Sequence, residues 1–285
     1  MPAPHSTPVM RPEEFRLLRE LIQDHCGLWF RDESAYLLER RLWPRLQSLG
    51  HASFGEYYRH LRYDLARRSE LETAVELLTT NETYFWREPQ QLRAFGEEIL
   101  PMLAEENARE RRLRVWSAGC ATGEEAYTIA IMLSRSGLFG GWALDVLGSD
   151  ISRRVLAVAR EGTYGPHAFR APESAAVKPW FTHAGGAKLT VRPAIREMVS
   201  FAHLNLLDVN AISVVGRVDV IFCRNVMIYF DLAARRQVSA SFHQKLRDGG
   251  FLLLGHSESL LNVTADFELV HLKNDLVYRK PRSLP

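Results

Sequence analysis

The residues most suited to chemistry lie in residues 114–131, RVWSAGCATGEEAYTIAI, which read as a short apolar run, a loop with two glycines and two glutamates, and the start of a helix. Gly119 and Gly123 let the backbone of this loop approach a ligand closely. Two familiar phosphate-binding patterns are absent. Gly123 is followed by Glu124 and Glu125 where a P-loop has lysine and a hydroxyl residue, and no GxGxxG fingerprint is present. The loop is therefore predicted to bind a small molecule without phosphate groups.

The acidity of this loop indicates a cationic ligand, because two carboxylates at a helix start would repel a pyrophosphate that seeks the same amides. S-adenosylmethionine fits, since it has a sulfonium, an ammonium and ribose hydroxyls but no phosphate. Asp150, at the end of the next apolar run, is the candidate for the ribose. The alternative is that Glu124 and Glu125 only complement the helix dipole, a contribution of about 0.3 to 1 kcal/mol.

Two other stretches also carry candidate residues. In residues 79–90, TTNETYFWREPQ, Arg87 follows three aromatic residues and offers a guanidinium that can bind a carboxylate through two hydrogen bonds. The alternative for this stretch is a helix terminus followed by a hydrophobic staple. In residues 221–231, IFCRNVMIYFD, Asn225 falls at the end of a predicted strand, facing the crevice where open α/β sheets bind ligands. Tyr229 by itself is more typical of a core residue than of a catalytic one.

The elements that position these residues alternate between apolar runs and helical patterns from about residue 112. The runs are LRVWSA (113–118), ALDVLGSD (143–150), MVSFAHLNL (198–206), VDVIFC (218–223) and FLLLGH (251–256). Such runs predict strands buried on both faces, and their alternation with helices predicts an α/β fold with a doubly wound, mostly parallel, Rossmann-like sheet. FELVHLKNDLVYRK near the C-terminus predicts an antiparallel hairpin. A stretch rich in proline and glycine predicts a small subdomain inserted at about residues 165–196.

From about residue 12 to residue 80 the pattern is helical, without strand signals. Ser53 with Glu56, and Ser69 with Glu72, have the spacing of capping boxes and predict two helix starts. Pro44 is expected to kink or end a helix that begins near residue 32.

The composition excludes several classes of protein. The chain has 285 residues and a formal net charge of +2, without a long basic block that would favour nucleic acid. Its three cysteines, Cys26, Cys120 and Cys223, form no CxxC pair, so neither a disulfide framework nor a metal site is predicted. MPAPHSTPVM lacks the apolar core of a signal peptide, and no apolar run is long enough for a membrane span. We expect a cytoplasmic protein without membrane insertion.

The motifs NETYFWRE, VWSAGCATGEEAYTIA, SDIS, NLL, FCRNVMIYFD and LGHSESL, in this order, closely resemble the CheR family of chemoreceptor glutamate methyltransferases. The resemblance covers about residues 12–280. It implies a helical domain at residues 1–80, a linker at 81–95 that carries NETYFWRE, and a class I methyltransferase domain at 96–285 with a small inserted β-subdomain. It also implies S-adenosylmethionine-dependent methylation of glutamate side chains on the cytoplasmic helices of chemoreceptors, for adaptation in chemotaxis. The products would be glutamate methyl esters and S-adenosylhomocysteine.

The resemblance also implies roles for individual residues. The cofactor contacts would be Asn81, Thr83, Arg87, Gly119, Glu125, Asp150, Asn205, Leu206, Asn225 and Val226. Glu124 would then be a helix-start charge. Arg87 and Tyr229 match residues that place the substrate near the methyl group, and they are the catalytic candidates.

The family docks a basic helix of its N-terminal domain onto the receptor, and here that helix carries Arg40, Arg41 and Arg45. The alternative is a solvated surface face. Some members also bind a pentapeptide at the receptor's C-terminus through a glycine-bearing loop. The corresponding segment here, THAGGAKLTV (182–191), is short, so we expect a monomer that works without this tether. Two other classes remain open: a methyltransferase acting on nucleic acid or a small molecule, although no [DN]PP[FY] motif is present, and a non-catalytic protein that binds the cofactor and docks on a receptor array.

Overall fold

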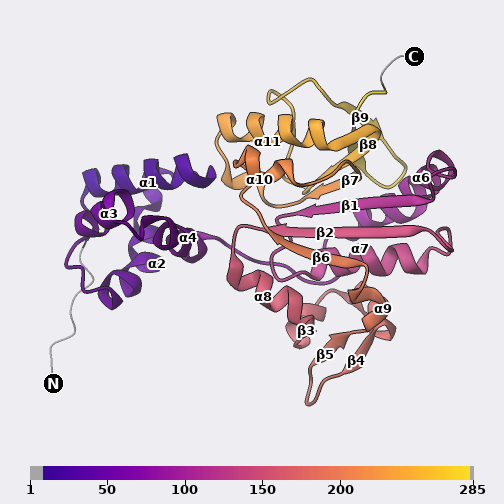
Figure 1. Ribbon diagram of the computed structural model, residues 1–285, viewed down its shortest axis with the longest axis horizontal. Coiled ribbons are helices and arrows are strands. Elements are labelled where there is room, and N and C mark those ends of the chain that lie inside the picture. Colours follow the sequence, from indigo (N-terminus) through magenta and orange to yellow (C-terminus); the bar gives the residue numbers. More distant parts are fainter. Residues whose placement is uncertain (1–8, 283–285) are drawn as a thin grey trace. The chain divides into compact units, whose positions relative to one another are not determined.

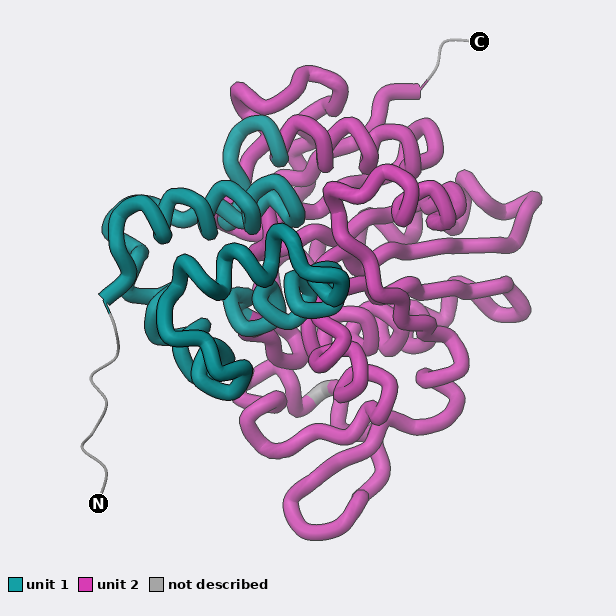
Figure 2. Tube along the Cα trace, turned by 60° about the vertical axis from the view of Figure 1, so that its left-hand side comes forward, with its two compact units in different colours: residues 1–80, 229–234 teal, residues 81–228, 235–285 magenta. Residues whose placement is uncertain are grey.

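The computed structural model describes residues 9–282, with the side chain of Ala176 excepted, so that the first residues of the MPAPHSTPVM segment lie outside it. The chain forms two compact units, shown in different colours in Figure 2. The helical unit contains the chain up to Thr80 together with Tyr229–Ala234, and the sheet unit contains Asn81–Ile228 and the chain from Arg235 onward. The sequence pattern does not indicate that Tyr229–Ala234 clusters with the N-terminal helices.

The helical unit consists of short helices around an apolar core. Its elements are α1 (Pro12–Cys26), the 3-10 helix η1 (Asp32–Ser34), α2 (Ala35–Ser48), α3 (Phe54–Tyr63) and α4 (Arg67–Leu78). Leu18, Leu38 and Tyr57 are fully buried where these helices pack. Beyond the helices, an isolated antiparallel bridge joins Leu28 to Phe230 and brings Tyr229–Ala234 to the end of α1.

One of the two predicted capping boxes is wrong. Ser53 caps α3 as predicted, because its hydroxyl accepts a hydrogen bond from the Glu56 amide at 3.2 Å. Ser69 does not cap a helix, because α4 already begins at Arg67. The Ser69 hydroxyl instead donates to the Ala66 carbonyl at 3.0 Å, so Ser69 and Glu72 lie inside the helix.

Pro44 does not end its helix, since α2 continues through it to Ser48. Proline removes one backbone donor, which usually breaks a helix interior. Here the flanking residues Leu42 and Leu46 are completely buried. Their packing against the other helices outweighs the missing hydrogen bond.

The sheet unit is built on seven strands in the order β6-β2-β1-β7-β8-β10-β9 (Figure 1). The strands are β1 (Arg112–Ala118), β2 (Ala143–Asp150), β6 (Val199–His203), β7 (Val218–Cys223), β8 (Leu246–Leu254), β9 (Glu268–His271) and β10 (Leu276–Arg279). The first five strands pair in parallel, and β10 pairs antiparallel with both β8 and β9. The predicted α/β fold and its C-terminal hairpin are therefore confirmed.

Helices and short turns precede β1 and connect the strands that follow it. They are α5 (Pro89–Ala94), the π-helix η2 (Phe95–Ile99), α6 (Leu100–Glu106), α7 (Glu124–Arg135), α8 (Arg153–Glu161), α9 (Pro193–Arg196), α10 (Val209–Ser213), η5 (Met227–Tyr229) and α11 (Leu232–Lys245). A doubly wound sheet needs such cover on both faces, because its strands are apolar on both sides.

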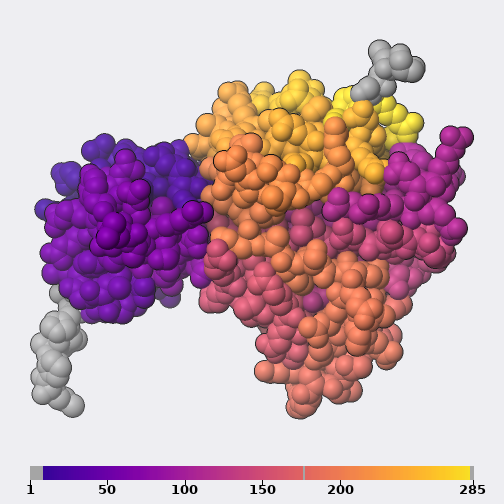
Figure 3. Space-filling view, viewed as in Figure 1, coloured from indigo at the N-terminus to yellow at the C-terminus, as the bar shows by residue number. Residues whose placement is uncertain are grey.

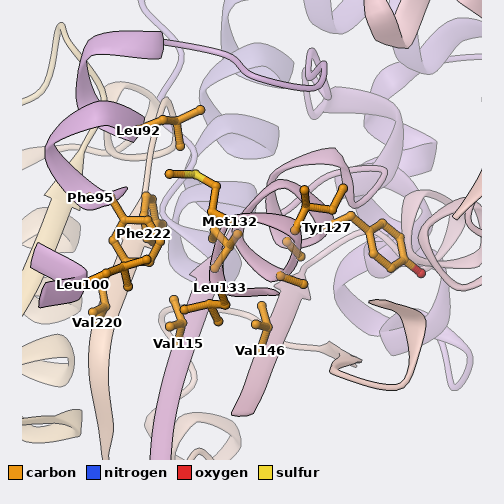
Figure 4. Close-up of a cluster of buried hydrophobic side chains, with 14 of the residues drawn as sticks. Leu92, Phe95, Leu100, Val115, Tyr127, Met132, Leu133, Val146, Val220 and Phe222 are labelled. Carbon is orange, nitrogen blue, oxygen red and sulfur yellow. The ribbon is translucent and has the colours of Figure 1, made fainter. Parts of the chain in front are cut away.

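Both faces of the sheet are indeed buried. On one face, side chains of β1, β2 and β7 pack against α5, η2, α6 and α7; Figure 4 shows Leu92, Phe95, Leu100, Val115, Tyr127, Met132, Leu133, Val146, Val220 and Phe222. On the other face, Trp116 of β1 meets Phe242 of α11 with ring centroids 5.3 Å apart. Val115 and Trp116 are neighbours in the sequence and point to opposite faces, as the period of a strand requires.

A second, three-stranded antiparallel sheet is inserted after α8. It consists of β3 (Thr163–Tyr164), β4 (Phe181–His183) and β5 (Leu189–Val191) in the order β3-β5-β4, with the 3-10 helices η3 (Pro166–Phe169) and η4 (Pro172–Trp180) between β3 and β4. In the space-filling view these residues project from the sheet unit (Figure 3). Phe85 of the NETYFWRE motif is fully buried and its ring stacks on Phe169 at 4.9 Å, so the insert anchors this motif.

Candidate functional site

The parallel strands bring three of the predicted residues to one edge of the sheet. Gly119 follows β1, Asp150 ends β2 and Asn225 follows β7, and these strands are neighbours. The carboxyl ends of parallel strands form the crevice where open α/β sheets bind ligands. Gly119 also touches the loop after β7: a Cβ added to it would lie 2.4 Å from Val226 Cγ2, and its φ is +88°. Only glycine fits there, because both the space and the backbone exclude a side chain.

Backbone strain concentrates in the three candidate stretches. Six described residues other than glycine have positive φ, and four of them are Trp86 (65°), Glu88 (56°), Ala121 (47°) and Asn225 (60°). Such conformations cost of order 1–3 kcal/mol each and persist only where the surrounding structure holds them, which is common at ligand sites. A simple linker or helix terminus would not require several residues in strained conformations within these stretches.

A buried ionic cluster joins the three stretches. Ser117 Oγ donates to Glu125 Oε1 at 2.7 Å, and Arg224 Nε lies 3.3 Å from Glu125 Oε2 and 3.7 Å from Glu88 Oε2. Arg224 Nη2 donates to the Arg87 carbonyl at 2.6 Å. Burial raises the pKa of Glu125, and the positive charge of Arg224 opposes that rise. Sequence reasoning missed Arg224 and Glu88, although both lie inside the motifs CRNV and FWRE.

Three polar atoms of this cluster have no hydrogen-bond partner within the described part of the chain: Arg224 Nε, Arg224 Nη1 and Asn225 Oδ1, all of them buried. The other end of the Asn225 amide, Nδ2, donates to Glu88 Oε1 at 3.3 Å. Arg224 Nε still has its ion pairs with the two glutamates, whereas Arg224 Nη1 and Asn225 Oδ1 have neither. Unpaired buried groups cost about 1–3 kcal/mol each, so these two atoms indicate a place for a polar ligand. The carboxylates of Glu125 and Glu88 provide acceptors that suit a ligand with an ammonium group, and Arg224 Nη1 provides a donor for a second polar group of the same ligand. The residues present therefore fit S-adenosylmethionine.

Asp150 has a second task besides its predicted contact with the ribose. Its carboxylate accepts hydrogen bonds from the Ala121 and Ser152 amides, both at 2.9 Å. Burial raises the pKa of Asp150, and these amide bonds act against the rise. The bond to Ala121 holds the glycine loop in its left-handed turn. The Ile151 amide also hydrogen-bonds to this carboxylate. Since a carboxylate has about four acceptor positions, capacity remains for a ribose hydroxyl.

The two adjacent glutamates have different surroundings. Glu125 meets Ser117 and Arg224, as above, whereas Glu124 is buried at the start of α7 and accepts a hydrogen bond from Thr122 Oγ1 at 2.6 Å. Burial also raises the pKa of Glu124. Cys120, in the same loop, is buried, and burial raises the pKa of its thiol well above the usual range, so it is unsuited to nucleophilic chemistry.

The remaining predicted residues of the sheet unit lie in two segments, one after β6 and one before α5. Asn205 follows β6, and its Oδ1 accepts a hydrogen bond from the Leu207 amide at 3.0 Å, while Leu206 is buried. Thr83 precedes the anchored Phe85, and its carbonyl accepts a bond from Arg170 at 3.3 Å. Asn81 opens the same segment, where it is half-buried.

Arg87 keeps its guanidinium partly exposed. Its Nη1 donates to the Glu82 carbonyl at 2.5 Å, and the guanidinium lies 5.8 Å from the centre of the Tyr84 ring. The charge therefore lies at the surface, although the Arg87 carbonyl is bound by the buried Arg224.

The other predicted residues belong to the helical unit. Tyr229 is half-buried, and its carbonyl accepts a bond from the Trp29 amide at 2.8 Å. Arg45 binds Glu70 through two hydrogen bonds of 3.0 and 2.6 Å. Arg41 Nη1 donates to the Leu78 carbonyl at 2.5 Å. Both arginines thus help to hold the helical unit together, whereas Arg40 is exposed.

Among residues 9–282, every helix is too short or too polar to span a lipid bilayer. No group of three or more histidine, cysteine or acidic side chains in that range has an arrangement that could hold a metal ion.

Comparison with known proteins gives the same result for both parts of the chain. Residues 81–276 match the family described as CheR methyltransferase, SAM binding domain, and residues 13–79 match the family described as CheR methyltransferase, all-alpha domain. Chemotaxis protein methyltransferase 2 of Vibrio cholerae is 31% identical over 96% of this chain and 94% of its own length. Chemotaxis protein methyltransferase 1 of Pseudomonas aeruginosa is 32% identical, covering 93% and 97%, and the chemotaxis protein methyltransferase of Salmonella typhimurium is 35% identical, covering 90% and 86%. The chain therefore belongs to the CheR family of methyltransferases and contains that family's S-adenosylmethionine-binding domain.

Proposed function

We propose that this protein methylates glutamate side chains on the cytoplasmic helices of chemoreceptors, as part of adaptation in chemotaxis-type signalling. The relatives that match over nearly their full length carry the name chemotaxis protein methyltransferase. The observation that supports the site most directly is the buried cluster of Glu125, Arg224 and Glu88 at the carboxyl edge of the sheet. We also propose that the protein acts in the cytoplasm as a monomer. Its domains would comprise residues 1–80 and 96–285, joined by a linker at 81–95.

The reaction needs no general base. A glutamate side chain has a reference pKa of about 4.3, so at neutral pH it is already a carboxylate nucleophile. S-adenosylmethionine, when bound, supplies a methyl group on a positively charged sulfur. A carboxylate oxygen forms a bond to the methyl carbon while the carbon–sulfur bond breaks, and the sulfur keeps that electron pair. The products are a methyl ester and S-adenosylhomocysteine, and no proton is transferred.

The site residues then act by binding and orientation. Glu125 and Glu88 attract the cationic end of the cofactor, and the free Oδ1 of Asn225 accepts a hydrogen bond from it. Asp150 accepts a hydrogen bond from a ribose hydroxyl. Gly119 leaves room for the cofactor to approach the backbone after β1. The contacts proposed for Asn81, Thr83, Asn205, Leu206 and Val226 complete the binding site.

Arg87 would orient the incoming glutamate through a charge-assisted pair, at some cost to the nucleophilicity of that carboxylate. Its partly exposed guanidinium, held near Tyr84, suits a group that meets a macromolecular substrate. Tyr229 would assist in placing the same side chain.

The receptor would dock on the basic helix α2, mainly at Arg40. Arg41 and Arg45 are already bound inside the helical unit, so they would contribute long-range attraction more than direct contacts. We propose that docking does not need a pentapeptide tether. The turn between β4 and β5 is short, with the Ala184 amide donating to the Lys188 carbonyl at 3.0 Å.

The test is incubation of the protein with methyl-labelled S-adenosylmethionine and cytoplasmic fragments of chemoreceptors. Base-labile label on the receptor fragment, lost when its acceptor glutamates are replaced by alanine, is the expected result. Cofactor binding without labelled receptor would support a non-catalytic array protein instead. Base-stable label, or label on another class of molecule, would support a different substrate.

A further inference from the structure

One side chain connects the two loops that follow β7 and β8. The Glu258 carboxylate accepts four backbone hydrogen bonds: Oε2 from the amides of Gly255 and Asn225, both at 2.7 Å, and Oε1 from the amides of Val226 at 2.9 Å and Ile228 at 3.1 Å. Because β7 and β8 are parallel neighbours, both loops lie at the same edge of the sheet. A single carboxylate therefore holds the backbone that carries two of the proposed cofactor contacts.

The chain around Glu258 is shaped to allow this arrangement. The Glu258 amide donates to the Gly255 carbonyl at 2.8 Å, and this turn brings the side chain back toward β7. A Cβ added to Gly255 would lie 2.7 Å from Glu258 Oε2 and 2.8 Å from the Asn225 nitrogen. Any side chain at position 255 would displace the carboxylate, so the close approach depends on both residues.

The backbone that Glu258 holds is strained and faces the candidate site. Asn225 has a φ of +60°, and its buried Oδ1 has no partner among the described residues. The side chain of Val226 fills the space where a side chain on Gly119 would be. Without the carboxylate, the amides of Asn225 and Val226 would lose their acceptors, and only the longer bond from Asn225 Nδ2 to Glu88, at 3.3 Å, would still help to offset the strain at Asn225.

We infer that Glu258 is a positioning residue for the cofactor: it holds Asn225 and Val226 in the conformation that binds S-adenosylmethionine, without touching the cofactor itself. The inference rests on the proposed function for the identity of the ligand. Glu258 lies in the LGHSESL motif, and the sequence by itself indicates no role for this residue.

The experiment compares Glu258→Gln, Glu258→Asp and a matched control, Glu98→Gln. Glutamine keeps the size of the side chain but replaces one acceptor oxygen by a donor, whereas aspartate keeps the charge and is shorter by one methylene. Glu98 is a suitable control because it also binds backbone amides, those of Lys273 at 2.7 Å and Asn274 at 3.1 Å, in the turn between β9 and β10. Calorimetry with S-adenosylhomocysteine gives the Kd of the folded full-length protein, and thermal unfolding gives its stability.

We expect Glu258→Gln to weaken binding by about tenfold or more, because hydrogen bonds to a charged group are the strong ones. The Kd of Glu258→Asp should lie between that of Glu258→Gln and that of the unchanged protein. Glu98→Gln should lower the Tm without changing the Kd. In turnover assays the KM for S-adenosylmethionine should rise by a larger factor than kcat falls. An unchanged Kd in folded Glu258→Gln, with a Tm loss like that of the control, would reduce Glu258 to a purely structural residue and overturn the inference.

Two further variants keep the test decisive if Glu258→Gln does not fold. Gly255→Ala places a Cβ between the Glu258 carboxylate and the Asn225 amide and so separates the two without altering the chemistry of either. It should weaken binding; an unchanged Kd would overturn the inference. In the Asn225→Ala background, Glu258→Asp should add less to the loss of affinity than it does alone, since both act on one contact. Fully additive losses would contradict the inference. Absence of binding by the unchanged protein would instead refute the proposed function, so the two failures are distinguishable.

Discussion

Replacing Arg224 by methionine tests the buried ionic cluster. The Arg224 side chain is 2% exposed and lies 3.3 Å from Glu125 Oε2, so its removal leaves an uncompensated carboxylate. Breaking a buried pair in this way costs roughly 3–5 kcal/mol. Glu125 and Glu88 are 15% and 22% exposed, which lets water reduce the penalty, so we expect a loss of about 3 kcal/mol in the unfolding free energy of the sheet unit.

The unfolding free energy that Arg224→Met loses should depend on pH, and the pKa of Glu125 sets the sign of this dependence. Burial already raises the pKa of Glu125, and without Arg224 this pKa rises further. A carboxyl group with a raised folded pKa contributes its full stability below its unfolded pKa, near 4.3, and loses it as the pH rises toward the folded value. The deficit of Arg224→Met should therefore be smallest near pH 4.5 and grow toward pH 7.5.

Hydrogen exchange of the amides in β1 and β7 measures the sheet unit separately from the helical unit. The double variant Arg224→Met with Glu125→Gln is the matched control, because it removes the uncompensated charge. It should regain most of the lost stability at pH 7.5. A deficit below about 1 kcal/mol, no growth with pH, or no rescue by Glu125→Gln would refute this account of the cluster.

Three other predictions concern the site residues. Arg87→Ala should impair receptor methylation by far more than it changes the Tm, as its guanidinium is partly exposed; near-normal turnover would contradict its proposed role. Asp150→Asn should weaken cofactor binding in calorimetry, because it loses an acceptor that serves the ribose and the Ala121 amide, and unchanged affinity would refute the ribose contact. Gly119→Ala should destabilise the sheet unit by about 1–3 kcal/mol and weaken binding, since its Cβ would meet Val226 Cγ2 at 2.4 Å in a left-handed backbone; a fully stable variant with unchanged Kd would refute the steric argument.

Much of the fold could be predicted because burial on two faces produces a visible pattern. Each apolar run from LRVWSA to FLLLGH overlaps a strand, although the runs at 198–206 and 251–256 continue past the ends of β6 and β8. Lys273, Asn274 and Asp275 lie in the turn of the predicted hairpin. The helix start predicted at Ser69 is wrong and α2 does not end at Pro44, and both outcomes have a common cause. Pro44 and Ser69 were interpreted from local preferences, whereas tertiary packing decides whether a helix continues and where it begins.

The candidate site could be predicted only in part. Gly119, Asp150 and Asn225 follow or end strands, so the parallel topology alone brings them to one edge. Arg224, Glu88 and Glu258 were missed as functional residues. Each acts through partners that are distant in the sequence, as when Glu258 binds the amide of Asn225. No local spacing encodes such a contact.

By itself, the sequence determined the chemistry of the ligand. Two adjacent glutamates, and no lysine, after Gly123 argue against phosphate groups and for a cationic ligand. This argument does not depend on the direction in which the two glutamate side chains point. Tertiary structure alone decided which glutamate pairs with Arg224. Neighbouring residues on a helix point about 100° apart, so at the start of α7 Glu125 meets Arg224 while Glu124 meets Thr122. It also decided that Glu258 holds the loop after β7, because that contact exists only once β7 and β8 lie side by side.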